Sequence, residues 1–130
     1  MEKPGMVVDT SIFIEHLRAA NKANTTFQQL PDQSQLYVSS VTLYELYTGA
    51  STPSKWADVR TVTEDITVLF FDQAVAEKAA LIYQQLKKAN QLIEFRDIFI
   101  AATALVNQLP VLTKNARHFQ RIQNLRVVVK

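Results

Sequence analysis

The chain alternates between short apolar runs rich in β-branched residues and longer stretches in which apolar residues recur every three or four positions. The first pattern predicts buried strands, and the second predicts amphipathic helices. We expect strands at 6–8, 36–38, 66–71, 111–112 and 126–129. We expect helices at 10–20, 41–50, 54–63, 73–89, 98–108 and 116–122. This alternation predicts a three-layer α/β fold in which helices flank a central parallel sheet.

Residues typical of helix ends lie between these segments. Pro53 suits the first turn of a helix, Asp72 is expected to cap the next helix, and Pro110 is expected to end the helix 98–108. The polar connection 21–35 is expected to hold little regular structure. Because the sequence shows no internal repeat, linker or low-complexity stretch, we expect residues 1–130 to form a single domain.

Composition narrows the function classes without choosing one. The 48% hydrophobic and 20% charged content is ordinary for a globular protein, and no apolar run approaches the roughly 18 residues of a membrane span. The first five residues lack the apolar core of a secretory signal, so a cytoplasmic location is expected. Zero cysteines exclude disulfides and thiolate metal sites, which leaves oxygen ligands or the two histidines. The formal net charge of +2 permits nucleic-acid binding but does not require it.

Polar residues mark four places where an apolar run gives way to a helical pattern: Asp9, Glu45, Asp97 and Asn115. In an open α/β sheet such junctions lie at the carboxyl ends of the strands, where ligand sites form. Carboxylates gathered at one edge repel one another, and a divalent cation relieves that repulsion. Oxygen ligands favour Mg²⁺, with Mn²⁺ as a substitute, and such a site suits phosphodiester hydrolysis.

Each carboxylate also has a simpler structural interpretation. Asp9 and Asp97 could each cap the helix that follows, by accepting a backbone N–H bond. The spacing Thr42-x-x-Glu45 fits a capping box, in which the glutamate folds back onto the first amide of its helix. The ordered set of junction acids, rather than any one of them, favours the metal site.

Four blocks of the sequence together resemble a PIN-domain toxin of the VapC type. They are Val-Val-Asp-Thr-Ser at 7–11, Ser-Val-Thr-Leu-Tyr-Glu-Leu at 40–46, Asp-Ile-Phe-Ile-Ala-Ala-Thr-Ala at 97–104 and Val-Leu-Thr-Lys-Asn-Ala-Arg-His-Phe at 111–119. The resemblance extends from Met6 to about Leu125. It implies a Mg²⁺-dependent endoribonuclease that acts on RNA, is neutralised by a cognate VapB-like antitoxin and is usually a homodimer.

The resemblance also implies roles for particular residues. Asp9 and Asp97 would be the most direct metal ligands, and Glu45 would complete the acidic triad directly or through water. Ser11 would help to hold the site and its water, and Thr113 would support the strand end.

The fourth position departs from the family pattern. Asn115 stands where many relatives carry a fourth acid, so occupancy of a second metal position is left open. Glu94 could partly compensate, although a solvated loop glutamate is the simpler interpretation. Lys114 and Arg117 are candidates for contact with the phosphate backbone of RNA. His118 is interpreted as a partly buried or surface histidine rather than a ligand.

Aromatic residues near the second block admit two interpretations. Tyr44, Tyr47 and Trp56 could stack on bases or receive an antitoxin segment, and their spacing fits helix packing or a dimer face equally well.

Two other functions remain as alternatives. A phosphoacceptor receiver domain would use Asp9 for metal, Asp72 as the acceptor and Lys114 as the strand-end lysine, but it needs a second acid beside Asp9 and leaves Glu45 and Asp97 unexplained. A non-catalytic PIN-like binding module would keep the fold and the partner surface without the chemistry.

Overall fold

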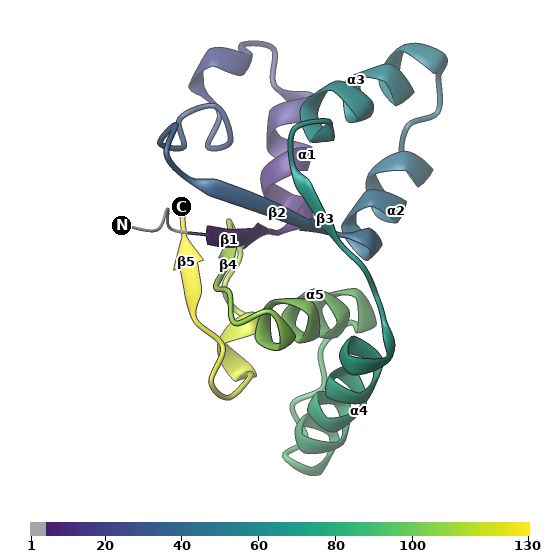
Figure 1. Cartoon of the computed structure of the whole chain (residues 1–130), viewed down its shortest axis with the longest axis vertical. Helices are drawn as coiled ribbons and strands as arrows, with labels where there is room; N and C mark the ends of the chain where they lie inside the picture. Colours follow the sequence, from purple (N-terminus) through teal and green to yellow (C-terminus); the bar gives the residue numbers. More distant parts are fainter. Residues whose placement is uncertain (1–4) are drawn as a thin grey trace.

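The computed structural model describes residues 5–130, which contain a five-stranded, all-parallel sheet with the strand order β3-β2-β1-β4-β5 (Figure 1). The strands are β1 Gly5–Val8, β2 Gln35–Ser39, β3 Thr67–Leu69, β4 Val111–Thr113 and β5 Val127–Val129. The helices are α1 Thr10–Arg18, α2 Ser40–Thr48, α3 Pro53–Thr63, α4 Gln73–Lys88 and α5 Phe95–Val106, with 3₁₀ turns η1 Lys22–Asn24 and η2 Phe119–Arg121. The expected α/β architecture with a parallel sheet is confirmed.

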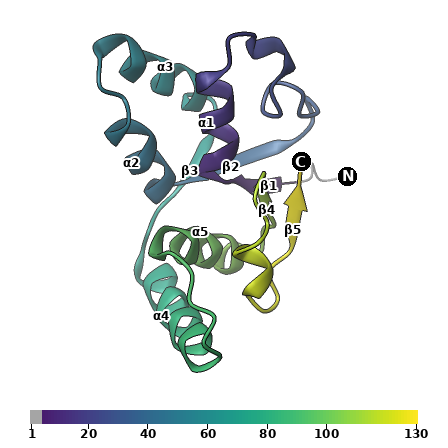
Figure 2. The same ribbon diagram turned by 180° about the vertical axis from the view of Figure 1, so that it is seen from behind.

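Helices cover both faces of the sheet, in two separate layers. Helices α1, α2 and α3 lie on one face, and α4 and α5 lie on the other (Figures 1 and 2). Adjacent residues of β1 point to opposite faces of the sheet. Val7 packs in the core under α4 and α5, whereas Val8 packs in the core under α1 to α3. This alternation follows from the two-residue period of a strand. None of the helices formed by residues 5–130 has the length and apolar character needed to cross a bilayer.

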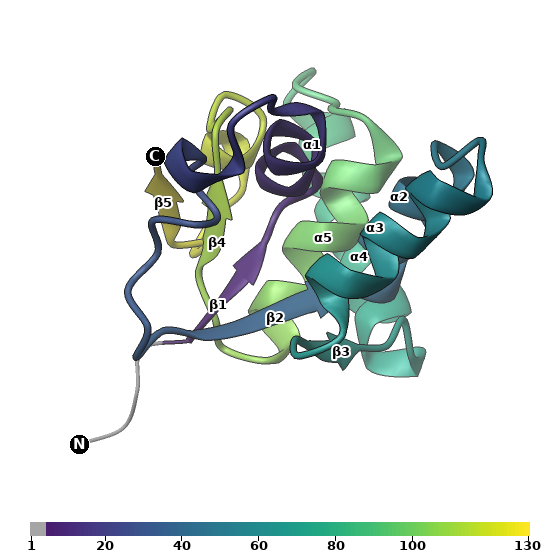
Figure 3. The same ribbon diagram turned by 90° about the horizontal axis from the view of Figure 1, so that it is seen from above.

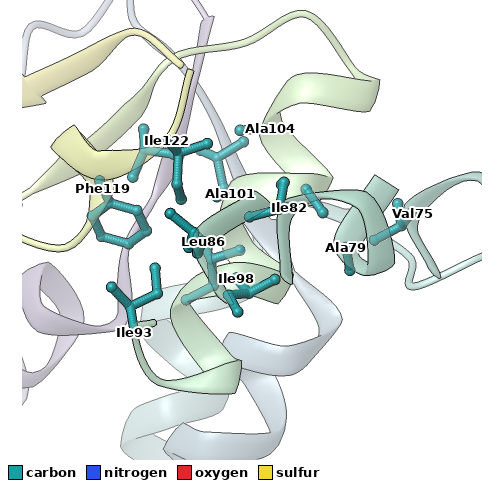
Figure 4. Close-up of a cluster of buried hydrophobic side chains, with 14 residues drawn as sticks. Val75, Ala79, Ile82, Leu86, Ile93, Ile98, Ala101, Ala104, Phe119 and Ile122 are labelled. Carbon is teal, nitrogen blue, oxygen red and sulfur yellow. The ribbon is translucent and has the colours of Figure 1, made fainter. Parts of the chain in front are cut away.

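The core on the α4 and α5 side is closed by residues from the end of the chain. Figure 4 shows Ile82 and Leu86 of α4 meeting Ile98 of α5, with Phe119 and Ile122 packed against them. Phe119 is 1% exposed, so the segment after β4 is anchored in the core. This anchor positions the neighbouring polar residues at the edge of the sheet.

Three elements differ from those expected, and one of them is α5, which spans Phe95–Val106 where a helix was expected at 98–108. The helix expected at 116–122 is reduced to η2, because Thr113 and Asn115 side chains accept the backbone N–H groups of Asn115 and Arg117 at 3.0 and 3.3 Å and so compete with helix formation. The strand expected at 66–71 is only β3, because its pairing with β2 ends at Leu69 opposite Ser39. Asp72 caps α4 as expected, accepting the N–H of Val75 at 3.0 Å.

Strand register brings distant segments to one edge. Val8 pairs with Leu112, so Asp9 and Thr113 follow side by side at the carboxyl ends of β1 and β4. Strand β2 ends beside them and leads directly into α2. Figure 3 shows β1 running into α1, with α2 and α5 on the same side of the molecule.

Candidate active site

Asp9 follows β1 and is held by two hydroxyl groups. Its side chain is buried, and its Oδ2 accepts hydrogen bonds from Ser11 Oγ and Thr113 Oγ1, each at 2.8 Å. Asp9 occupies the position before α1 but makes no side-chain capping bond. The capping interpretation of Asp9 is therefore wrong, and its carboxylate is oriented by β4 and the first turn of α1 instead.

Glu45 lies within α2, away from the start of the helix. Ser39 is the capping residue of α2, since its Oγ accepts the N–H of Thr42 at 3.0 Å, so the capping-box interpretation of Glu45 is wrong. Glu45 Oε1 instead accepts a 2.9 Å hydrogen bond from Thr10 Oγ1, and Glu45 Oε2 pairs with Arg96 Nη1 at 3.2 Å. Both oxygens of this carboxylate are thus engaged.

A chain of buried hydroxyls supports Glu45 from the inside. Ser39 Oγ donates to Thr42 Oγ1 at 3.2 Å, and Thr42 Oγ1 lies 3.0 Å from Thr10 Oγ1. Because Thr10 donates to Glu45, the bonds run in one direction, from the end of β2 to the carboxylate. These hydroxyls fix the rotamer of Glu45 through groups that are themselves packed in the interior.

Asp97 lies in the first turn of α5. The helix begins at Phe95 with Glu94 at the capping position, so the expected helix start and the capping interpretation of Asp97 are wrong. Asp97 Oδ2 lies 2.8 Å from His118 Nδ1. Burial raises the pKa of the Asp97 carboxyl above its ordinary value; the hydrogen bond from His118 opposes this rise, and the negative charge of Asp9 adds to it.

The three carboxylates line one cleft of about 640 Å³ at the carboxyl edge of the sheet. The other lining residues include Thr10, Ser11, Tyr44, Glu94, Arg96, Asn115 and His118. The structure therefore brings together the residues singled out at the four junctions. Two carboxylates that repel each other inside a cleft form a donor set suited to a hard divalent cation.

The third carboxylate is not arranged with the other two as a ligand. Among residues 5–130, no group of three acidic or histidine side chains is close enough together to hold a metal ion in this conformation. Glu45 is turned to Thr10 and Arg96. Asp9 and Asp97 thus fit a cation by their chemistry, and Glu45 fits only after its contact with Arg96 is released.

The supporting candidates divide between the cleft and its surroundings. Asn115 lines the cleft, and its Oδ1 accepts the N–H of Arg117. Glu94 lines the rim and pairs with Arg96 Nε at 3.1 Å. Lys114 is bound to Glu15 at 3.0 Å, and neither Lys114 nor Arg117 is among the residues that line the cleft.

Sequence reasoning did not identify Arg96 as a site residue and gave His118 a minor role. Arg96 stands next to Asp97 in the first turn of α5, which is the one sequence signal that could have marked it. The contact between His118 and Asp97 depends on how the segment after β4 packs, so the sequence gives no local signal for it. Tyr47 packs against Trp56 with ring centroids 4.4 Å apart, whereas the exposed Tyr44 lines the cleft.

Comparison with known proteins identifies the fold family. A family model described as the PIN domain matches residues 6–125. The chain belongs to the PIN-domain family. The receiver-domain alternative is thereby excluded.

The relatives of this PIN domain carry the VapC name. It is 31% identical to Ribonuclease VapC of Rickettsia bellii, with 95% of each chain covered. It is 32% identical to Ribonuclease VapC2 of Haemophilus influenzae, with 92% of this chain and 93% of that protein covered. Among solved structures, VapBC-1 from nontypeable Haemophilus influenzae matches with a TM-score of 0.80 and 28% identity over 96% of this chain and 97% of that chain. The resemblance to VapC-type PIN domains is confirmed.

Proposed function

We propose that this PIN domain is a metal-dependent endoribonuclease toxin of the VapC type, which hydrolyses RNA and is neutralised by a VapB-like antitoxin. The observation that carries the proposal is the convergence of Asp9, Glu45 and Asp97 on one cleft. The names of its relatives, Ribonuclease VapC, and of its structural neighbours, VapBC complexes, support the same function.

Each residue of the cleft has a distinct task in this proposal. Asp9 and Asp97 would hold Mg²⁺, or Mn²⁺ in its place, while Ser11 and Thr113 keep Asp9 in one orientation. A bound cation would lower the pKa of a bound water and neutralise charge on the phosphate. Glu45, once released from Arg96, would contact the cation directly or through water, and Asn115 would orient water in the cleft. Attack of water on phosphorus would break the bond to the 3′ oxygen, leaving a 5′ phosphate and a 3′ hydroxyl.

The decisive test removes one carboxylate charge at a time. Asp9→Asn and Asp97→Asn should each abolish Mg²⁺-dependent RNA cleavage, with the circular dichroism spectrum and the melting temperature retained. The matched control is Asp32→Asn, which makes the same change at an exposed site outside the cleft and should leave cleavage intact. Undiminished cleavage by Asp9→Asn would overturn the assignment.

A trough between α1, α2 and α3 supports the antitoxin partner. It has a volume of about 240 Å³, and its lining includes Ile14, Leu17, Leu46 and Val59. Ile14, Glu45 and Gly49 line both this trough and the acidic cleft, so a segment seated in the trough reaches the cleft directly. Leu17→Lys should weaken inhibition by the antitoxin without reducing cleavage, since Leu17 does not line the cleft.

A second apolar groove supports a homodimer. It lies on the face formed by α4 and α5, and its lining includes Phe71, Tyr83, Phe95 and Phe99. Phe95 is 64% exposed, although it lies beside the rings of Tyr83 and Phe99, and a cluster of exposed aromatic rings is typical of an interaction surface. A second copy of the chain would cover this groove.

The non-catalytic binding module is retained as a second candidate on one observation. Glu45 is paired with Arg96, and the described residues hold no group of three ligands ready for a metal. If the wild-type protein shows no RNA cleavage with Mg²⁺ or Mn²⁺, while the antitoxin still binds, this second candidate replaces the nuclease.

A further inference from the structure

We propose that Arg96 is a built-in counter-cation, which holds Glu45 in the metal-free protein and releases it when a divalent cation binds. The inference rests on the proposed metal site and adds to it a residue that sets the cation concentration at which the site fills. Arg96 is a positioning residue in this account, because it acts through Glu45.

The two contacts of Glu45 differ in how firmly they are held. Oε1 is bound by Thr10, which is 8% exposed and is itself in contact with the fully buried Thr42. Oε2 is bound by Arg96, whose side chain is 55% exposed. Breaking the contact with Thr10 would remove a hydrogen bond from the interior, whereas the half-exposed Arg96 side chain can turn out into solvent. Glu45 is therefore presented to the cleft with one fixed oxygen and one exchangeable oxygen.

Glu94 gives Arg96 a second anchor. Arg96 Nε lies 3.1 Å from Glu94 Oε2, and the Glu94 side chain is 59% exposed at the start of α5. When Glu45 is taken by a cation, Arg96 keeps this partner and stays at the rim of the cleft. The structure thus assigns Glu94 to Arg96, in place of the compensating ligand role considered for it from the sequence.

The guanidinium of Arg96 and a divalent metal ion compete for Glu45, because both are positively charged. Arg96 is 55% exposed and Glu45 is 18% exposed, so water partly screens their ion pair and limits its free energy. A divalent cation held by Asp9 and Asp97 can therefore displace the guanidinium from Glu45. The contact nonetheless opposes metal binding by a small amount, because it must be broken first. Removing Arg96 should therefore tighten cation binding by about fivefold, the upper value for one exposed pair.

Cation binding can be measured without RNA. Free Mn²⁺ is followed by electron paramagnetic resonance while Mn²⁺ alone is titrated into the full chain, and Asp9→Asn identifies the signal that belongs to the cleft. Arg96→Gln should bind Mn²⁺ about fivefold more tightly than the wild type. Arg117→Gln removes the same charge from a side chain that does not line the cleft, and its affinity should stay within about twofold of wild type.

Three results would overturn the assignment. They are an unchanged or weaker Mn²⁺ affinity in Arg96→Gln, an equal gain in Arg117→Gln, and a gain from Arg96→Gln that persists at full size when Glu45→Gln is also present. The last two would show that Arg96 acts through its charge at long range rather than through Glu45. A weaker affinity would indicate that Arg96 supports the site.

The test separates this inference from the proposed nuclease. If Arg96→Gln binds Mn²⁺ more tightly than the wild type and Arg117→Gln does not, but the wild type cleaves no RNA, the nuclease proposal fails and the role of Arg96 stands. If the wild type cleaves RNA and Arg96→Gln leaves the Mn²⁺ affinity unchanged, the role of Arg96 fails alone.

Discussion

His118 Nδ1 lies 2.8 Å from Asp97 Oδ2, and the contact joins the segment after β4 to the first turn of α5. The neighbouring Phe119 is buried in the core, so the imidazole is held in place rather than free at the surface. An ionised carboxylate can only accept a hydrogen bond, so this contact favours the ionised form of Asp97. His118 therefore helps to keep Asp97 available for a cation.

Replacing His118 should change the pH dependence of cleavage. In His118→Ala the pKa of Asp97 should rise further, because burial and repulsion from Asp9 remain while the opposing hydrogen bond is lost. A higher pKa means that more of the carboxyl is protonated at a given acidic pH, so the acidic limb of the profile should move to higher pH. His118→Gln keeps a hydrogen-bond donor and should move it less. An acidic limb that does not move would contradict the role given to His118.

Removing the hydroxyl of Thr113 should weaken both the fold and the site. In Thr113→Val, buried Asp9 Oδ2 keeps only Ser11 as a donor, so the free energy of unfolding measured with urea should fall by about 1–3 kcal/mol. RNA cleavage should fall as well, because Asp9 loses its orientation. Thr103→Val is the matched control, since the Thr103 hydroxyl donates only to the Phe99 carbonyl of its own helix. Equal loss of cleavage in both variants would contradict the prediction.

A carboxylate at the fourth position should strengthen cation binding. Asn115→Asp can still accept the N–H of Arg117, and it adds a negative charge to the lining of the cleft. Mn²⁺ affinity should increase by about three- to tenfold, as expected for one added charge in a partly screened site. Asn115→Ala should lose the local hydrogen bond without this gain. If Asn115→Asp leaves both the affinity and the number of bound ions unchanged, this position lies outside the cation site.

A charge in the aromatic groove should separate a dimer. Phe95→Asp introduces a carboxylate beside Tyr83 and Phe99, so the dimer dissociation constant measured by analytical ultracentrifugation should rise by about 30-fold or more. Leu81→Asp is the control, because Leu81 is 54% exposed on α4 but does not line the groove. A wild type that is monomeric at high concentration would refute the homodimer, and equal dissociation in both variants would place the interface elsewhere.

The sequence predicted the layers of the fold well because strand and helix periods are local signals. Val7 and Val8 illustrate this, because successive side chains of a strand point to opposite faces, and these two neighbours enter the two different cores. Helix starts were less predictable where several residues can cap. Ser39 and Thr42 both suit the start of α2, and Ser39 is the one that caps it. The choice depends on where β2 stops pairing with its neighbours.

The contacts between residues of the cleft were harder to predict from the sequence than the identity of the residues that line it. Asp9, Glu45 and Asp97 were marked as an ordered set within four blocks of the sequence, and each block can be found without knowing any long-range contact. The pairing of Arg96 with Glu45 joins residues 51 positions apart and depends on how α5 lies against α2. No periodicity in either helix specifies that arrangement, so the sequence could mark Arg96 only as a neighbour of Asp97 and not as the partner of Glu45.

The hydrogen bond between Thr113 and Asp9 also has a consequence for biosynthesis. The two residues are 104 positions apart, and they meet only because β4 pairs with β1 in one register. A growing chain that has not yet passed Thr113 contains Asp9 and Glu45 but lacks the hydroxyl that holds Asp9 and the strand that brings it there. The acidic cleft therefore cannot be completed during translation before β4 has been synthesised and has paired with β1.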